Sequence, residues 1–174
     1  MSIVDPLSIT MENAMDVQVV KVAAEHDHAL CDVIKKVGAE YGAIGDGFGP
    51  SDPEVLAMSE HYHEKAGSLY LVALVDGEVV GGGGIAPFGE HAGVCELKKL
   101  FLLPKSRGLG LGKKLTEQCL AFAKQQGYQS CYLDTLSSMA AAIKLYELAG
   151  FEHLSKPYPG TLHNGCDVWM LKTL

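Results

Sequence analysis

A run of glycines between two predicted regular segments is the first place where this sequence could do chemistry. The run is Arg107-Gly108-Leu109-Gly110-Leu111-Gly112, followed by Lys113. Backbone N–H groups left uncovered by glycine, together with a helix N-terminus, can hold a pyrophosphate. Arg107 stands where a Walker loop needs its first glycine, and Lys113 replaces the third glycine of a dinucleotide fingerprint. We therefore expect a diphosphate site that needs no metal; the alternative is a tight turn that uses glycine only for its positive φ values.

Composition and charge limit the kind of protein that can surround this turn. The chain has 174 residues, of which 48% are hydrophobic and 20% charged, which is typical of one compact globular domain over residues 1–174. Fourteen Lys and Arg against 21 Asp and Glu give a net charge of −7. Such an acidic chain without a basic run disfavours a nucleic-acid partner and weakly favours an amine substrate. No apolar run approaches the roughly 20 residues of a membrane span, so we expect no membrane partner.

The cysteines and the N-terminal residues give information about the cellular location of the protein. The five cysteines are scattered and never form a C-x-x-C pair, which indicates reduced thiols in a cytoplasmic protein. Residues 1–15 contain no Lys or Arg and no long apolar core, so they do not resemble a signal peptide. Met11 and Met15 leave open a later translation start, which would make residues 1–15 an extra N-terminal segment.

The hydrophobic periodicity predicts a mixed α/β domain around the glycine turn. Strands are expected over 17–22, 68–76, 79–88, 94–103, 130–135 and 166–174, and helices over 29–37, 51–65, 111–126 and 137–149. Asp76-Gly77 predicts a hairpin turn between the second and third strands. Because a helix separates them, the strands over 94–103 and 130–135 should run parallel.

Local signals refine several of these elements. Ser51 with Glu54 reads as a capping box, and Ser137 or Ser138 reads as the N-cap of the last helix. Gly81 to Gly84 weaken their strand and indicate a bulge or a close approach by another molecule. Consecutive Lys98 and Lys99 break the period of two, as a bulge would.

Three segments, in this order and spacing, resemble the GNAT acetyltransferase superfamily. They are the strand Glu96–Leu102, the turn Arg107-x-x-Gly110-x-Gly112, and Leu145–Phe151 with a tyrosine ahead of Gly-Phe. The resemblance is good from Ser68 to Phe151, and Met139 departs from it because many members have Asn there. It implies an α/β (α+β) fold with a mixed, mostly antiparallel sheet. That sheet would have six to seven strands, would splay at a parallel pair, and would be flanked by about four helices.

The resemblance also implies acetyl-CoA as co-substrate, with no metal, and assigns the site residues. The coenzyme would be held by Arg107, Gly108, Leu109, Gly110, Leu111, Gly112, Lys113 and Tyr146, and its pantetheine arm by Leu100, Phe101 and Leu102. A backbone N–H near Leu102 could stabilise the oxyanion of the tetrahedral intermediate. Tyr146 would be the general acid for the leaving thiolate, or else a core tyrosine. Glu96 would be the general base, or else a solvated carboxylate.

Other polar residues are candidates for the acceptor site. The resemblance places the turn before the strand Glu96–Leu102 and the connection before the last strand near the acceptor, so His91, Tyr158 and His163 could contact the substrate. His61 and His63 point to different faces of their predicted helix and do not form a metal site.

Together these expectations describe a cytoplasmic N-acetyltransferase that acetylates a small primary amine by direct attack within a ternary complex. One alternative is an acyl-CoA-binding sensor that does not turn over; others are a transferase acting on a peptide or protein amine, or a toxin-like transferase acting on charged tRNA. A homodimer is possible, since symmetric association is common. The acceptor itself is not readable from the sequence.

Overall fold

The computed structural model describes residues 15–174, so the expectations for residues 1–14 lie outside the described residues. Within that range the chain forms a seven-stranded sheet in the order β1-β2-β3-β4-β5-β7-β6. The strands are β1 (Val17–Lys21), β2 (Leu69–Val75), β3 (Glu78–Pro87), β4 (Val94–Leu102), β5 (Ser130–Thr135), β6 (Glu152–Leu154) and β7 (Val168–Thr173). The α-helices are α1 (Asp27–Glu40), α2 (Leu111–Gln125) and α3 (Ala140–Leu148).

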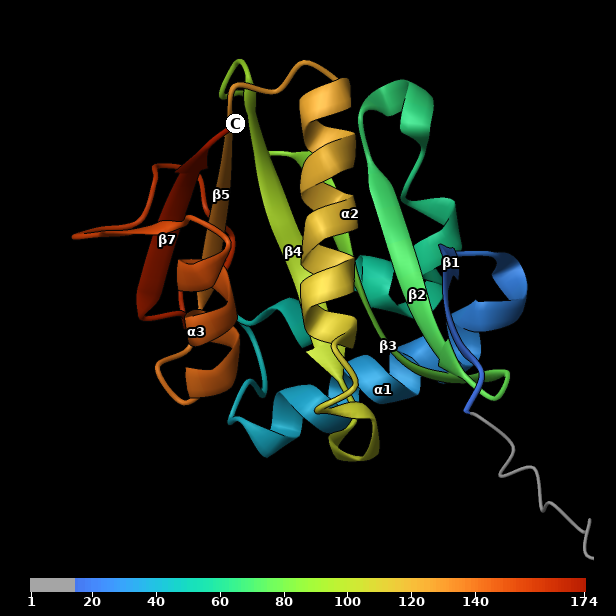
Figure 1. The fold of residues 1–174 in the computed structure, drawn as a ribbon. Coiled ribbons are helices and arrows are strands. Elements are labelled where there is room, and N and C mark those ends of the chain that lie inside the picture. The colour runs from blue at the N-terminus through green and yellow to red at the C-terminus, as the bar shows by residue number, and fades with distance from the viewer. Residues whose placement is uncertain (1–14) are drawn as a thin grey trace, which may run out of the picture.

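Helices cover both faces of the sheet, and strands β2 and β4 bury residues in both of the resulting cores. Leu115, Cys119 and Phe122 of α2 pack with Tyr146 of α3 on one face, where Figure 1 shows α2 crossing in front of β4. On the other face the buried stripe of α1 packs against the 3₁₀ segment η3 (Pro53–Glu60) and Tyr70 of β2. The sheet is therefore the middle layer of three.

Strands β4 and β5 are the parallel pair, and they part soon after they meet. Their register pairs Val94–Glu96 with Ser130–Tyr132, and β5 continues on its other side by pairing along its length with β7. In Figure 1 the two strands lie together near the C-terminus and separate toward α1. This confirms the expected mixed sheet splayed at a parallel pair.

The predicted turns and bulges are confirmed where local chemistry determines them. Asp76 and Gly77 form the hairpin turn with φ values of 49° and 78°. The β3–β4 register shifts between Gly82 and Gly84, opposite Lys99, which has a φ of 51°. The bulge therefore lies in the middle of β4, where the two lysines interrupt the alternation.

The helix predicted over residues 51–65 is wrong. The chain instead makes short 3₁₀ segments, η2 (Gly49–Ser51), η3 and η4 (Glu64–Ala66), and Ala57 inside η3 has non-helical angles. Asp52, not Ser51, is the N-cap of η3. The carboxylate of Glu54 binds Lys98 and Lys99 and is therefore not available to close a capping box.

One smaller expectation also fails beside α3. The N-cap is Met139, because Ser137 binds Asp167 through its backbone N–H and its hydroxyl, and the Ser138 hydroxyl donates to the Tyr41 carbonyl. Strand β6, which has only three residues, was not predicted, and it pairs with the β7 strand. Two further 3₁₀ segments, η1 (Ala24–His26) and η5 (Pro104–Ser106), complete the described elements. Across residues 15–174, no helix combines the length and apolarity that crossing a bilayer would require.

Candidate active site

The glycine turn borders a hollow of about 320 Å³ between the end of β4 and the start of α2 and α3. Gly108 and Gly110 have φ values of 83° and 75°, so the turn does use left-handed backbone that favours glycine. The predicted coenzyme residues that line this hollow are Leu100, Leu102, Arg107, Gly108, Gly110, Leu111, Gly112 and Lys113. Its volume is in the range of ligand pockets, and its walls are mainly apolar apart from the turn.

Arg107 organises the turn through its side chain. Its guanidinium donates to the Leu102 carbonyl at 2.9 and 3.1 Å and to the Glu40 carboxylate at 2.7 and 2.8 Å. The guanidinium also lies over the Tyr41 ring, 5.3 Å from its centroid. Because these contacts occupy the Arg107 side chain, the backbone N–H groups of the turn are the groups left to face a ligand.

Other predicted coenzyme residues lie elsewhere. Phe101 faces the opposite side of the sheet and lines a second hollow, and Leu109 is 41% exposed at the tip of the turn. Tyr146 is buried, packs edge-on against Phe151 at 5.9 Å, and is not among the described residues that line either hollow. Burial raises the pKa of Tyr146, so its hydroxyl holds its proton firmly.

The second hollow is small, about 60 Å³, and lies beside the place where β4 and β5 part. Besides Phe101, two predicted residues line it, the candidate base Glu96 and the candidate acceptor residue His163. Glu96 pairs with Tyr132 of β5, and Asp134 is two residues further along that strand, so all three side chains share one face. Met139 lines both this hollow and the one beside the glycine turn, so it is a wall residue common to the two.

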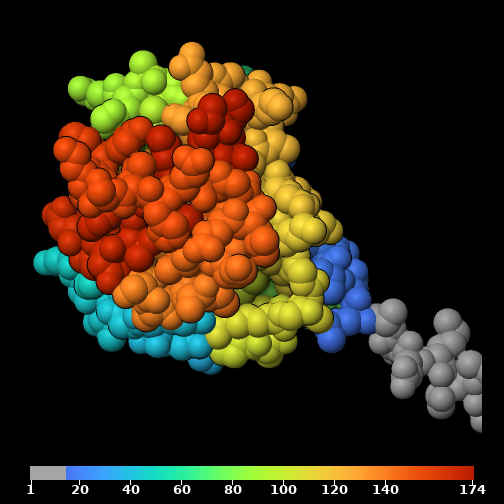
Figure 2. Space-filling view, turned by 60° about the vertical axis from the view of Figure 1, so that its left-hand side comes forward, coloured from blue at the N-terminus to red at the C-terminus, as the bar shows by residue number. Residues whose placement is uncertain are grey.

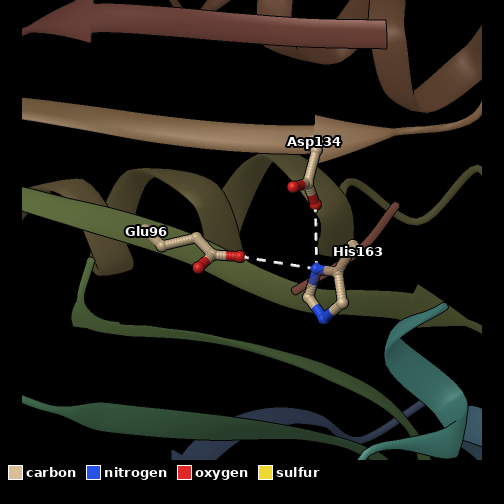
Figure 3. A group of neighbouring side chains, drawn as sticks. All are labelled: Glu96, Asp134 and His163. Carbon is tan, nitrogen blue, oxygen red and sulfur yellow. Dashed lines mark hydrogen bonds and ion pairs between the residues drawn. The ribbon is translucent and has the colours of Figure 1, made fainter. Parts of the chain in front are cut away.

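His163 stands at the centre of a buried charged cluster. Figure 3 shows Glu96 extending from β4 and Asp134 from β5 toward the same ring nitrogen. The His163 Nδ1 atom lies 2.9 Å from Asp134 Oδ1 and 3.7 Å from Glu96 Oε1, and Nε2 lies 2.9 Å from Asp52 Oδ2. Burial alone would lower the pKa of His163, but the hydrogen bonds that its ring donates to Asp134 and Asp52 outweigh burial and raise this pKa to about 9. The ring is therefore an imidazolium at neutral pH.

Glu96 is the group in this cluster whose ionisation lies near neutral pH. Burial and the adjacent Asp134 raise its pKa to about 7, against the opposing charges of Lys98, His163 and Lys99. Its exposed fraction is only 8%, so it is not the solvated carboxylate that was one interpretation of the sequence. A carboxylate of this pKa can accept a proton at physiological pH and release it again.

Ion pairs between two lysines of β4 and two carboxylates of the η3 region lie beside the cluster. The Lys99 ammonium group, which is 1% exposed, donates to Asp52 at 2.8 Å and also to Glu54. Lys98 donates to Glu54 at 2.9 Å. Although burial would raise the pKa of Asp52, its hydrogen bonds from His163 and Lys99 lower this pKa to about 2. The two consecutive lysines reach the same carboxylates because the bulge turns Lys99 to the same side as Lys98.

Two loops that contain glycine pack together beside the small hollow. The Gly165 N–H donates to the Gly47 carbonyl at 2.9 Å, and a Cβ on Gly165 would lie 2.4 Å from the Phe48 ring. In Figure 2 the cyan segment that follows α1 adjoins the orange and red C-terminal third along the lower edge of this face. The approach of these two segments limits the size of any group that reaches Glu96.

Two predicted acceptor residues do not border the small hollow. His91 Nε2 donates to the Pro159 carbonyl at 2.7 Å and the ring stacks on Phe88, while Tyr158 stacks on Tyr132. They form an aromatic group on the far side of Tyr132 from the charged cluster. Of the three predicted acceptor residues His91, Tyr158 and His163, only His163 lies next to Glu96.

Sequence reasoning missed Asp134, Asp52, Lys98, Lys99 and Cys166, all of which contact the cluster or line the small hollow. Asp134 could have been found, because it ends a strand expected to run parallel to the one that carries Glu96. Asp52 had no such signal, since it reaches His163 from 111 residues away in the chain.

Comparisons with known proteins identify the family of this chain. The family model for the acetyltransferase (GNAT) family matches residues 40–151. The uncharacterised N-acetyltransferase YjgM of Escherichia coli is 40% identical over 156 residues, which cover 88% of this chain and 93% of YjgM. N-acetylaspartate synthetase of Xenopus tropicalis is 37% identical over 98 residues, which cover 56% of this chain and 35% of that enzyme.

A solved structure supports the same fold. The PaiA N-acetyltransferase of Thermoplasma acidophilum, in complex with coenzyme A, aligns with a TM-score of 0.70 at 19% identity. The alignment covers 91% of this chain and 99% of PaiA. With the family match over more than half of its residues, the chain belongs to the GNAT acetyltransferase family and is an N-acetyltransferase.

Proposed function

We propose that this enzyme moves an acetyl group from acetyl-CoA to the primary amine of a small molecule by direct attack. The observation that carries the proposal is that Met139 lines both hollows, beside the opened end of β4 and β5. A thioester entering from the glycine turn would there face an amine held near Glu96. Both substrates can then be bound together, as direct transfer requires.

The hollow beside the glycine turn suits the coenzyme. Backbone N–H groups from Gly108 to Gly112 and the N-terminus of α2 would hold the diphosphate, with Lys113 adding positive charge at the rim. Leu100 and Leu102 line the same hollow and would flank the pantetheine arm where β4 has left β5. This support is independent of the Arg107 side chain, which is bound to Glu40 and Leu102.

The buried cluster suits the proton transfers. An alkyl ammonium has a pKa near ~10.4 and must lose a proton before its nitrogen can attack the thioester carbon. Glu96 would accept that proton, directly or through one water, while Asp134 adds negative charge that attracts the ammonium. The C–N bond forms, the C–S bond breaks, and the leaving thiolate takes a proton, which the family resemblance assigns to Tyr146.

The size and charge of the small hollow restrict which acceptor molecules can fit. About 60 Å³ admits the amine end of a slender molecule and little more. Lys98 lies in its wall and is partly exposed, so a carboxylate on the acceptor could be accommodated as well. The name of the similar N-acetylaspartate synthetase also points to an amino acid. Small amino acids therefore head the panel of acceptors, followed by polyamines and peptide N-termini.

Release of coenzyme A thiol across this panel tests the proposal. Wild type should turn over one class, Glu96→Gln should lose about 10²–10⁴-fold in kcat, and Tyr146→Phe should lose activity with its acetyl-CoA affinity intact. Tyr128→Phe is the matched control, because the Tyr128 hydroxyl donates to the Gly67 carbonyl, away from both hollows. Tight coenzyme binding without turnover on any amine would contradict the proposal and favour a sensor.

Location and assembly are further parts of the proposal. The five cysteines are free, and a protein with unpaired thiols suits the reducing cytoplasm. Homodimerisation is expected from the general frequency of symmetric association, and light scattering of the purified chain measures it directly. A monomeric mass at micromolar concentration would contradict the dimer without affecting the proposed reaction.

A further inference from the structure

Three side chains of the buried cluster, Glu96, Asp134 and His163, bring potential metal-ligand atoms close together. His163 Nδ1, Glu96 and Asp134 each offer one donor atom, and these atoms all lie within 4.8 Å of one another. The three residues come from β4, β5 and the connection before β7, and none is exposed. They also line one hollow, which Cys166 borders too, so a small ion has a way in.

Carboxylates hold both ring nitrogens of His163, so both carry hydrogen in the metal-free protein, and a metal ion at Nδ1 would displace the proton there. Asp52 can only accept, so the Nε2 atom of His163, at 2.9 Å from it, carries hydrogen. Asp134 already accepts from the Thr161 hydroxyl through its other oxygen and presents Oδ1 to Nδ1. A bare Nδ1 facing two carboxylate oxygens would be repulsive. A positive charge must therefore lie between them, either as a proton on Nδ1 or as a metal ion.

We propose that Glu96, Asp134 and His163 form a binding site for a zinc-like divalent cation, which excludes the amine acceptor when bound. Zinc bonds of about 2.0–2.2 Å to imidazole and carboxylate place tetrahedral ligand atoms about 3.3 Å apart. The Nδ1 distances of 2.9 Å to Asp134 and 3.7 Å to Glu96 lie on either side of that value. Asp52 holds the other ring nitrogen, which is the outer-shell contact typical of a metal-bound histidine.

The cation would act as an inhibitor and not as a cofactor. A metal bound to Glu96 removes the proposed general base, and a metal bound to Asp134 removes the charge that attracts the ammonium. The coenzyme hollow has none of these ligands, so acetyl-CoA should still bind. Only this inhibitory effect rests on the proposed function; binding of the metal does not.

Zinc binding is measured first, without any enzyme assay. The chain is stripped with a chelator, kept reduced with a phosphine, and titrated with Zn²⁺ against a chromophoric chelator. Wild type should bind one equivalent. The His163→Gln and Asp134→Asn variants should lose more than about 100-fold in affinity, and Asp52→Asn about 10- to 100-fold as an outer-shell change.

Matched controls separate this site from surface binding and from misfolding. His153→Gln removes an exposed histidine that pairs with Glu147 at 3.1 Å, and it should leave zinc affinity unchanged. Each site variant must keep the thermal midpoint and acetyl-CoA affinity expected of folded protein. Co²⁺ gives a second readout, because four-coordinate visible bands should appear in wild type and be absent from His163→Gln.

Two results would overturn the site: no stoichiometric zinc binding at tens of micromolar, or binding that persists unchanged in His163→Gln and Asp134→Asn. Once an acceptor is known, Zn²⁺ should compete with the amine and not with acetyl-CoA. Inhibition competitive with acetyl-CoA would overturn the inhibitory role. If no amine is turned over, the binding experiment still decides the site by itself.

Discussion

At the scale of single residues, Glu96 shows how burial can make an ordinary carboxylate useful at neutral pH. Its pKa is raised to about 7 by burial and by Asp134. If Glu96 must be ionised to accept the proton, kcat/KM should rise with pH through about 7. The His163→Gln change should shift this rise in kcat/KM to higher pH, because the positive charge of the imidazolium lowers the pKa of Glu96. A rise that stays at the same pH in His163→Gln would contradict the assigned coupling.

The pKa of Glu96, and with it the expected pH dependence of kcat/KM, depends on four neighbouring charged groups. Asp134 from β5 raises its pKa, while Lys98 and Lys99 from β4 and His163 from the connection before β7 lower it. In the Glu96→Gln variant the rise of kcat/KM with pH should be absent. A pH profile that remains in Glu96→Gln would assign the base to another group or to water.

The same burial predicts a stability cost at high pH. Because its folded pKa lies above the usual 4.5, Glu96 contributes stability that is present below pH 4.5 and lost as pH rises through 7. Glu96→Gln should therefore be more stable than wild type at pH 8, by about 3 kcal/mol, and similar near pH 4.5. Urea unfolding at the two pH values measures this difference. A variant that is less stable at pH 8 would show that Glu96 is held by its partners more than it is penalised by burial.

At the scale of elements, the glycine run of β3 is there because the neighbouring chain lies too close for a side chain. A Cβ on Gly82 would lie 2.5 Å from the Leu71 carbonyl and 2.6 Å from the Tyr70 ring. Gly82→Ala should thus lower the free energy of unfolding by about 1–3 kcal/mol, as overpacking does. Gly49→Ala is the control, since its nearest neighbours are 3.8 Å away. Equal thermal midpoints for the two variants would contradict this account.

The elements also show where local signals mislead. Asp76-Gly77 turns the chain as predicted, because its positive φ values are a local property of the chain, and Gly127 and Gly150, also with positive φ, follow the ends of α2 and α3. The helix predicted over 51–65 failed because Asp52 and Glu54 bind Lys98 and Lys99 on a strand that is distant in sequence. A tertiary ion pair can thus override a capping pattern worth about 1 kcal/mol.

At the scale of the whole molecule, the two hollows can be filled at the same time, which predicts a ternary complex. Cys166 borders the acceptor hollow, but burial and Asp134 raise its pKa to about 12, so it remains a thiol. Initial rates with both substrates varied should give intersecting lines, and Cys166→Ser should retain most activity. Parallel lines, or an acetylated enzyme detected by mass spectrometry, would indicate a covalent route instead.

The sequence by itself determined most of the order of the elements, the parallel pair, the glycine turn and the candidate base, because each depends on neighbours within a few residues or on a motif of fixed spacing. Only the tertiary structure decided what surrounds that base. Asp52, Asp134 and His163 meet from three distant segments, and His91 and Tyr158, although close in sequence to plausible site loops, pack against Phe88 and Tyr132 instead. Electrostatic environment depends on distances through space, and a sequence does not record those distances.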